Sequence, residues 1–142
     1  MEKIPSFQKN HDTLQIGLHA QTDKNGVTTF DLRFKKPNAG DYITPKALHT
    51  VEHLLATTLR NGRGKDDIVY FGPMGCRTGF YLLTLRRSFD DGKALIKEAI
   101  KEALALKEIP GSRREECGNY LEHDLEGAKK ELKAYLELLN KE

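Results

Sequence analysis

The sequence has little cysteine, no long apolar run and almost no excess charge, and each shortage excludes a class of protein. Two cysteines among 142 residues cannot build a disulfide framework, so we expect free thiols in a cytoplasmic protein. No segment approaches the roughly 20 apolar residues of a membrane-spanning helix, and no apolar stretch follows the charged first residues as in a signal peptide. A formal net charge of +2 predicts no nucleic-acid or membrane partner.

The composition is that of a soluble globular protein, with 38% hydrophobic and 31% charged residues. A chain of 142 residues is long enough to bury one substantial core. We find neither an internal repeat nor a low-complexity segment. We therefore expect a single domain over residues 1–142.

The first third of the chain predicts a β-hairpin. Residues 13–19 and 27–34 alternate apolar and polar side chains, as half-buried strands do. Between them residues 23–26 end in Asn-Gly, which tolerates the positive φ of tight hairpin turns. Because Phe30, Leu32 and Phe34 share the inner face of the second strand, Arg33 is expected to be an ordinary solvated charge.

The rest of the chain alternates helices and strands. Thr44 and Pro45 form an N-cap and first-turn pair, which predicts a helix over residues 45–59. The other predicted elements are strands at 68–71 and 79–85, a helix at 92–107 capped by Asp90 and Asp91, a short helix at 112–117 and a last helix at 125–139. This order favours an α+β fold, with helices packed on one face of a mostly antiparallel sheet.

An H-x-x-E-H motif at residues 49–53 lies inside the first long predicted helix. Residues four apart differ by about 40° around a helix, so His49 and His53 leave the same face one turn apart. This spacing suits two nitrogens bound to one metal ion. Glu52 can flank that ion as a general base, as in inverted zinc-peptidase motifs. Two ordinary helix histidines are the alternative, and the intervening glutamate favours the metal site.

A metal ion needs a third protein ligand, and two kinds lie downstream. Cys117 would supply a thiolate, which beside two imidazoles suits zinc, ferrous iron or cobalt. A carboxylate within residues 122–126 would suit a hydrolytic zinc site. The spacing alone does not decide between them.

Cys76 lies between Gly75 and Gly79 and next to Arg77. Glycines let the backbone approach a ligand closely, and a neighbouring arginine favours a thiolate. We therefore place an acid–base or nucleophilic cysteine here, against the alternative of a small buried residue. Ser6 and His11 add a hydroxyl and an imidazole before the first strand, but such residues are common near chain ends.

The motifs together resemble one family, the S-ribosylhomocysteine lyases (LuxS). The resemblance follows the order of the blocks over nearly the whole chain and is most specific at P-M-G-C-x-T-G and H-D-L-E-G-A. The matching blocks are residues 6–7 with His11, 30–34, 37–38, 49–56, 73–82, 109–110, 117–118 and 123–129.

The resemblance implies an α+β homodimer with two active sites at the subunit interface. It implies one divalent metal ion per subunit, Fe²⁺ with Zn²⁺ or Co²⁺ able to substitute, bound by His49, His53 and Cys117 with a water. It also implies an acid–base pair and a set of residues that bind S-ribosylhomocysteine. The pair is Cys76 with Glu52, and the substrate-binding residues are Ser6, His11, Arg33 and, toward the partner subunit's site, Arg60.

The implied reaction cleaves the thioether of S-ribosylhomocysteine to homocysteine and 4,5-dihydroxy-2,3-pentanedione, the precursor of the signal autoinducer-2. Four residues depart from the family pattern: Tyr70 and Gly72 replace Asp and Ser, and Lys35 and Lys36 precede Pro37 in place of other residues. We expect these departures to alter contacts with the homocysteine end of the substrate.

Two further readings follow from the motif. In a small zinc peptidase, Glu126 would be the third ligand and Glu52 would activate a water; this reading leaves Cys76 without a role. In a binding module, the histidines would hold a structural zinc ion and no substrate would turn over.

Overall fold

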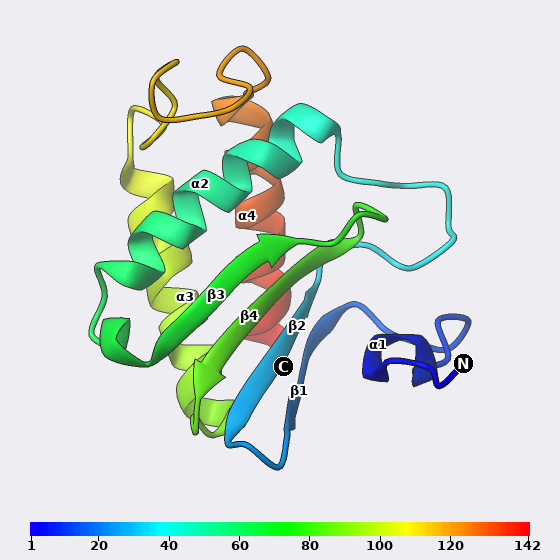
Figure 1. The fold of residues 1–142 in the computed structure, drawn as a ribbon. Helices are drawn as coiled ribbons and strands as arrows, with labels where there is room; N and C mark the ends of the chain where they lie inside the picture. The colour runs from blue at the N-terminus through cyan, green and yellow to red at the C-terminus, as the bar shows by residue number, and fades with distance from the viewer.

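The computed structural model describes residues 1–142 and has one antiparallel sheet with three long helices on one of its faces (Figure 1). The sheet order is β1-β2-β4-β3, and every neighbouring pair is antiparallel. The strands are β1 (Gly17–Thr22), β2 (Val27–Arg33), β3 (Ile68–Pro73) and β4 (Gly79–Leu85). The helices are α1 (Pro5–Gln8), α2 (Pro45–Arg60), α3 (Phe89–Ala105) and α4 (Leu125–Lys141), with a 3₁₀ turn η1 (Lys65–Asp67). The predicted α+β fold with helices on one sheet face is confirmed.

Most predicted elements are present, and the differences lie at their ends. Helix α2 begins as predicted, because the Thr44 side chain accepts a hydrogen bond from the Ala47 N–H. Strand β1 begins only at Gly17, so the strand predicted from residue 13 starts too early. Helix α3 is capped by Ser88, whose hydroxyl accepts from the Asp91 N–H, and not by the two aspartates. The short helix predicted at residues 112–117 is wrong, since this segment forms turns only.

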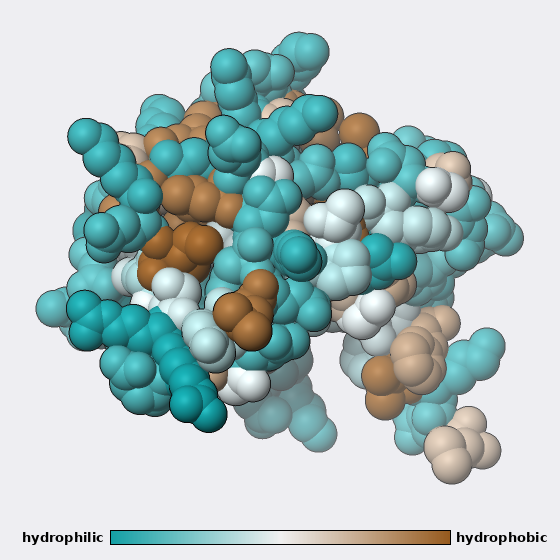
Figure 2. Space-filling view, turned by 90° about the horizontal axis from the view of Figure 1, so that it is seen from above, coloured by the Kyte–Doolittle hydropathy of each residue, from teal (hydrophilic) through white to brown (hydrophobic).

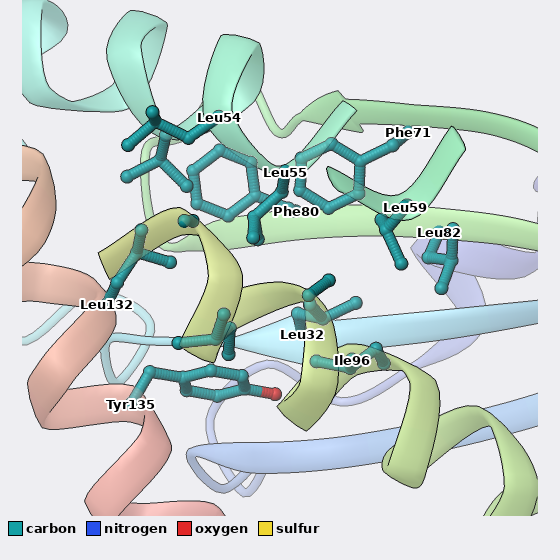
Figure 3. Close-up of a cluster of buried hydrophobic side chains, with 14 of the residues drawn as sticks. Leu32, Leu54, Leu55, Leu59, Phe71, Phe80, Leu82, Ile96, Leu132 and Tyr135 are labelled. Carbon is teal, nitrogen blue, oxygen red and sulfur yellow. The ribbon is translucent and has the colours of Figure 1, made fainter. Parts of the chain in front are cut away.

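The core lies between the sheet and α2, α3 and α4. Leu54, Leu55 and Leu59 of α2 pack onto aromatic and aliphatic side chains of β3 and β4 (Figure 3). Tyr135 of α4 is also buried, and its hydroxyl donates a hydrogen bond of 2.8 Å to the carbonyl of Gly17 at the start of β1. This burial raises the pKa of Tyr135 well above its ordinary value. The long helices are thereby fixed over the sheet.

The opposite face of the sheet is less covered. The N-terminal segment with α1 borders a cavity of about 310 Å³ against β1, β2 and β4, and Ser6 lines it. Val69, Tyr70 and Leu85 are 44%, 51% and 45% exposed, so apolar surface remains open on these strands. No helix of the structure is both long and apolar enough to cross a bilayer.

The expectation of a solvated Arg33 is wrong. Its side chain is 1% exposed and forms a bidentate pair with Asp31, itself fully buried. Both residues belong to β2, where residues 31 and 33 share the face opposite the helices. Alternation correctly placed Arg33 on the sheet face away from the helices. The N-terminal segment covers this part of the face, and its Lys9 also pairs with Asp31 at 3.0 Å.

Candidate metal centre

Helix α2 presents its two motif histidines from a firmly seated helix. Val51, Leu54 and Leu55 are at most 1% exposed, so the rotation of α2 about its axis is fixed by burial. His49 and His53 lie at the half-buried margin of the same helix, facing the loops between α3 and α4. The helical spacing thus places both rings toward one point, as predicted from the motif.

Two backbone carbonyls orient these rings. Nδ1 of His49 lies 2.8 Å from the carbonyl of Glu122, and Nδ1 of His53 lies 2.9 Å from that of Pro110. A carbonyl can only accept, so each Nδ1 carries the proton and each Nε2 presents a lone pair. Metal-binding histidines in proteins are held in this way by their second ring nitrogen.

The free nitrogens converge with the sulfur of Cys117. Nε2 of His49 and Nε2 of His53 are 3.1 Å apart, and Sγ of Cys117 lies 3.4 Å and 3.9 Å from them. A tetrahedral ion with ordinary Zn–N and Zn–S bonds would separate its ligand atoms by about 3.3–3.6 Å. Two lone pairs at 3.1 Å repel each other unless a cation lies between them. The donor set therefore fits one divalent ion.

A third histidine completes the group. Nε2 of His123 lies 3.8 Å from Sγ of Cys117, and the four ligand atoms all lie within 4.8 Å of one another. The ring of His123 stacks on that of His49, with centroids 4.0 Å apart. Its Nδ1 is 2.9 Å from the Thr50 hydroxyl, one residue after His49 on α2. His123 is the more distant member. The ligand atoms of His49, His53 and Cys117 lie within 3.9 Å of one another, whereas the group of four extends to 4.8 Å.

The surroundings keep His123 neutral. Burial is the main cause that lowers the pKa of His123 from 6.5 to about 4, and the proximity of the titratable His49 and His53 rings lowers it further. Glu122 acts in the opposite direction. A neutral imidazole is the form that binds a metal ion.

The cluster favours one of the two predicted kinds of third ligand. Cys117 is in the cluster, whereas none of the carboxylates in residues 122–126 is. The Glu122 side chain instead accepts from Asn119, and Glu126 is exposed in the first turn of α4. The peptidase reading with Glu126 as ligand is therefore wrong. His123 lies in the same range and was missed, although a histidine six residues after a candidate cysteine is a signal that could have found it.

The remaining predicted residues fall into three places. Glu52 lies next to His53 on α2 and is half-buried. Residues 107–113 line an open groove of about 810 Å³. They include Pro110, whose carbonyl accepts the hydrogen bond from His53. Figure 2 looks onto this end of the molecule, where hydrophobic residues form separate spots among hydrophilic ones.

Cys76 lies in the turn between β3 and β4, and it is not among the four residues of the metal cluster. Its sulfur is exposed, and its one polar contact is the Thr78 hydroxyl at 3.1 Å. The Arg77 side chain does not face the sulfur; it donates to the carbonyl of Ile43. Arg33 connects to this turn through Thr78. One chain thus holds two separate groups of functional residues.

Ser6, His11 and Arg60 occupy the periphery. Ser6 faces the cavity beside α1, and Nδ1 of His11 lies 3.0 Å from the carbonyl of Lys9. Arg60 ends α2 and donates to the carbonyl of Val69 on β3. None of the three contacts the metal cluster.

Comparisons with known proteins show which family this sequence matches. The family model for S-ribosylhomocysteinase (LuxS) matches residues 4–142. S-ribosylhomocysteine lyase of Borreliella afzelii is 45% identical over 147 residues, covering 99% of this chain and 94% of that protein. The enzyme of the same name from Clostridium acetobutylicum is 47% identical, covering 88% and 84%. That from Phocaeicola vulgatus is 45% identical, covering 96% and 89%.

The first prediction concerns metal retention. Cys117→Ala removes the thiolate and should weaken metal binding by about a hundredfold or more, because two imidazoles and a more distant third remain. Competition with a chromogenic chelator measures the change. Cys76→Ala is the matched control and should keep one equivalent of metal, since Cys76 lies outside the cluster. Tight binding of one equivalent by Cys117→Ala would contradict the site.

The second prediction concerns acid stability without metal. The unfolded chain protonates His123 near pH 6.5, but the folded protein does so only near pH 4. The unfolded state therefore binds more protons in between, and the free energy of unfolding should fall as the pH drops from about 6.5 to 4. Urea unfolding of the metal-free protein at several pH values measures this. His123→Gln should flatten the profile, whereas His19→Gln on β1 should not; equal slopes in both variants would refute the assignment.

Proposed function

This chain belongs to the S-ribosylhomocysteinase (LuxS) family, and we propose that it cleaves the thioether of S-ribosylhomocysteine to homocysteine and 4,5-dihydroxy-2,3-pentanedione. It is an enzyme, a carbon–sulfur lyase, so the reading as a non-catalytic zinc module is wrong. The second product is the precursor of autoinducer-2. The observation that carries the proposal is the convergence of His49, His53 and Cys117 beside Glu52.

The thioether cannot be eliminated directly. In the ribose the carbon next to the C5–sulfur bond bears no acidic proton. The sugar must open, and its carbonyl must move from C1 to C2 and then to C3. Once the ketone is at C3, the C4 proton is acidic and the homocysteine thiolate leaves by β-elimination. Each step therefore needs proton transfer and stabilisation of negative charge on oxygen.

The residues supply both needs. His49, His53 and Cys117 would hold the metal ion, which we take to be Fe²⁺ with Zn²⁺ or Co²⁺ able to substitute. When bound, the ion supplies a Lewis acid that stabilises charge on the sugar oxygens. Cys76 moves the protons at C1 and C2, and Glu52 removes the proton at C4. Both cysteines are free, which suits a reducing cytoplasm.

Substrate recognition falls to the N-terminal side. Ser6 and His11 contact the substrate, and Arg33 supports the binding site behind them; Ser6 already lines a cavity. Arg33 acts from below the surface, because its guanidinium is occupied by Asp31 and Thr78. The departures at Tyr70 and Gly72 are linked, since the Tyr70 ring occupies the space that a side chain at position 72 would need.

We infer a homodimer because Cys76 and the metal cluster are separated within one chain. Cys76 makes no contact with the metal cluster in its own chain, and the turn that carries it is apart from the loops that carry Cys117 (Figure 1). A second copy, packed on the open apolar surface of the sheet, would bring the thiol of one subunit to the metal site of the other. Arg60, at the end of α2 beside β3, would reach toward the partner's site.

The third prediction is a turnover test. Protein purified without oxygen should release thiol from S-ribosylhomocysteine, followed with a chromogenic disulfide. Cys76→Ala should release none and should incorporate no solvent deuterium into the sugar, because the first proton transfer is lost. Absence of thiol release above this control would refute the proposed reaction. Deuterium exchange between C1 and C2 in Cys76→Ala would refute the role of Cys76.

The fourth prediction tests the shared site. Cys76→Ala and His53→Ala should each be inactive alone. After subunit exchange, half of the dimers are mixed and each mixed dimer has one intact site, so activity should recover to about a quarter of that of the native protein. If verified mixed dimers stay inactive, the thiol and the metal belong to the same subunit.

A further inference from the structure

A buried hydrogen-bond chain leads from the N-terminal segment to Cys76. Lys9 Nζ lies 3.0 Å from Asp31 Oδ2, and Arg33 contacts both oxygens of Asp31, at 3.1 Å and 2.7 Å. Arg33 Nη1 then lies 2.7 Å from the Thr78 hydroxyl oxygen, which is 3.1 Å from Cys76 Sγ. Asp31, Arg33 and Thr78 are each at most 1% exposed. The middle of the chain is thus shielded from water, between the partly exposed Lys9 and the exposed sulfur of Cys76.

The donors in this chain have a fixed direction. A guanidinium has no acceptor, so Arg33 must donate to the Thr78 oxygen. A threonine hydroxyl has one proton, and Cys76 Sγ is the other polar atom within reach. The Thr78 proton is therefore free to point at the sulfur. Arg33 in turn is held in one orientation by the bidentate contact with Asp31.

The charges along the chain favour a negative group at its end. Lys9 and Arg33 are positive, whereas Asp31 is the only negative member, which leaves one surplus positive charge. Charge–charge interactions are strong where water is excluded. An anionic sulfur at Cys76 would balance this surplus.

The turn itself holds the sulfur near Thr78. Arg77 adopts a φ of 62°, a left-handed conformation that is uncommon outside glycine. Hydrogen bonds from Met74 N to Gly79 O and from Arg77 N to Met74 O close the turn. The Arg77 guanidinium is held at Ile43 and leaves Thr78 as the sole polar partner of Cys76.

We propose that Thr78 is a positioning residue that donates its hydroxyl proton to Cys76 Sγ and, oriented by Arg33, holds this sulfur as the reactive thiolate. This proposal rests on the proposed function only for the catalytic role of Cys76. Its test does not, because the reactivity of the thiol can be measured without substrate or metal.

The fifth prediction compares alkylation rates of Cys76. Native protein and variants are treated with iodoacetamide at pH 7, and modification is followed at the Cys76 peptide by mass spectrometry. Thr78→Val keeps the shape but loses the hydroxyl, and its rate should fall about tenfold, the effect of one hydrogen bond to a charged group. Thr78→Ser should restore at least half of the native rate. Thr78→Ala is a second hydroxyl-free variant in case the valine does not fold, as judged by circular dichroism.

Thr84→Val is the matched control. Thr84 is also a buried threonine, on β4, but its hydroxyl has no hydrogen-bond partner. This variant should alkylate at the native rate. An unchanged rate in Thr78→Val, or an equal loss in Thr78→Val and Thr84→Val, would overturn the proposal. If the rates follow the prediction but the native protein releases no thiol from S-ribosylhomocysteine, then the proposed function fails while the role of Thr78 stands.

Discussion

The metal cluster depends on the burial of one face of α2. Because Val51, Leu54 and Leu55 are buried on the sheet and the other helices, the helix cannot rotate, and His49 and His53 keep one direction. Two ligands are thereby placed without help from the metal. The remaining members come from residues 106–124, which form turns only. This segment is tied to α2 by the same imidazoles, whose Nδ1 atoms hold the carbonyls of Pro110 and Glu122.

The same histidines therefore act twice. Their Nδ1 atoms donate hydrogen bonds that order the loop backbone, and their Nε2 atoms present lone pairs to the cluster. Thr50 adds a third tie, because its hydroxyl accepts from the Asp124 N–H while it contacts Nδ1 of His123. Asp124 then caps α4 through its side chain. Metal binding, loop order and the start of α4 are consequently coupled, as is common where ligands come from irregular segments.

Sequence reasoning succeeded where a local rule decides the outcome. Alternation found β2, the Thr44–Pro45 pair found the start of α2, and helical spacing found both motif histidines. It failed where a segment distant in the sequence determines the burial or the position of a residue. Arg33 follows the alternation of β2, yet it is buried because Lys9 and the N-terminal segment cover that face. His123 has no periodic signal, and only the packing of the α3–α4 loops on α2 brings it to Cys117.

The division of functional residues between two places has a physical rationale. A metal-binding imidazole must be neutral, and burial is the main cause that keeps His123 so. A reactive cysteine must instead carry a charge, which burial disfavours; Cys76 is exposed, and the chain through Thr78 and Arg33 adds surplus positive charge beside it. Burial and exposure cannot both be provided at one point. Building each on its own scaffold, α2 for the metal and the β3–β4 turn for the thiol, lets each be tuned separately; in the homodimer that we propose, the two would meet across the subunit interface.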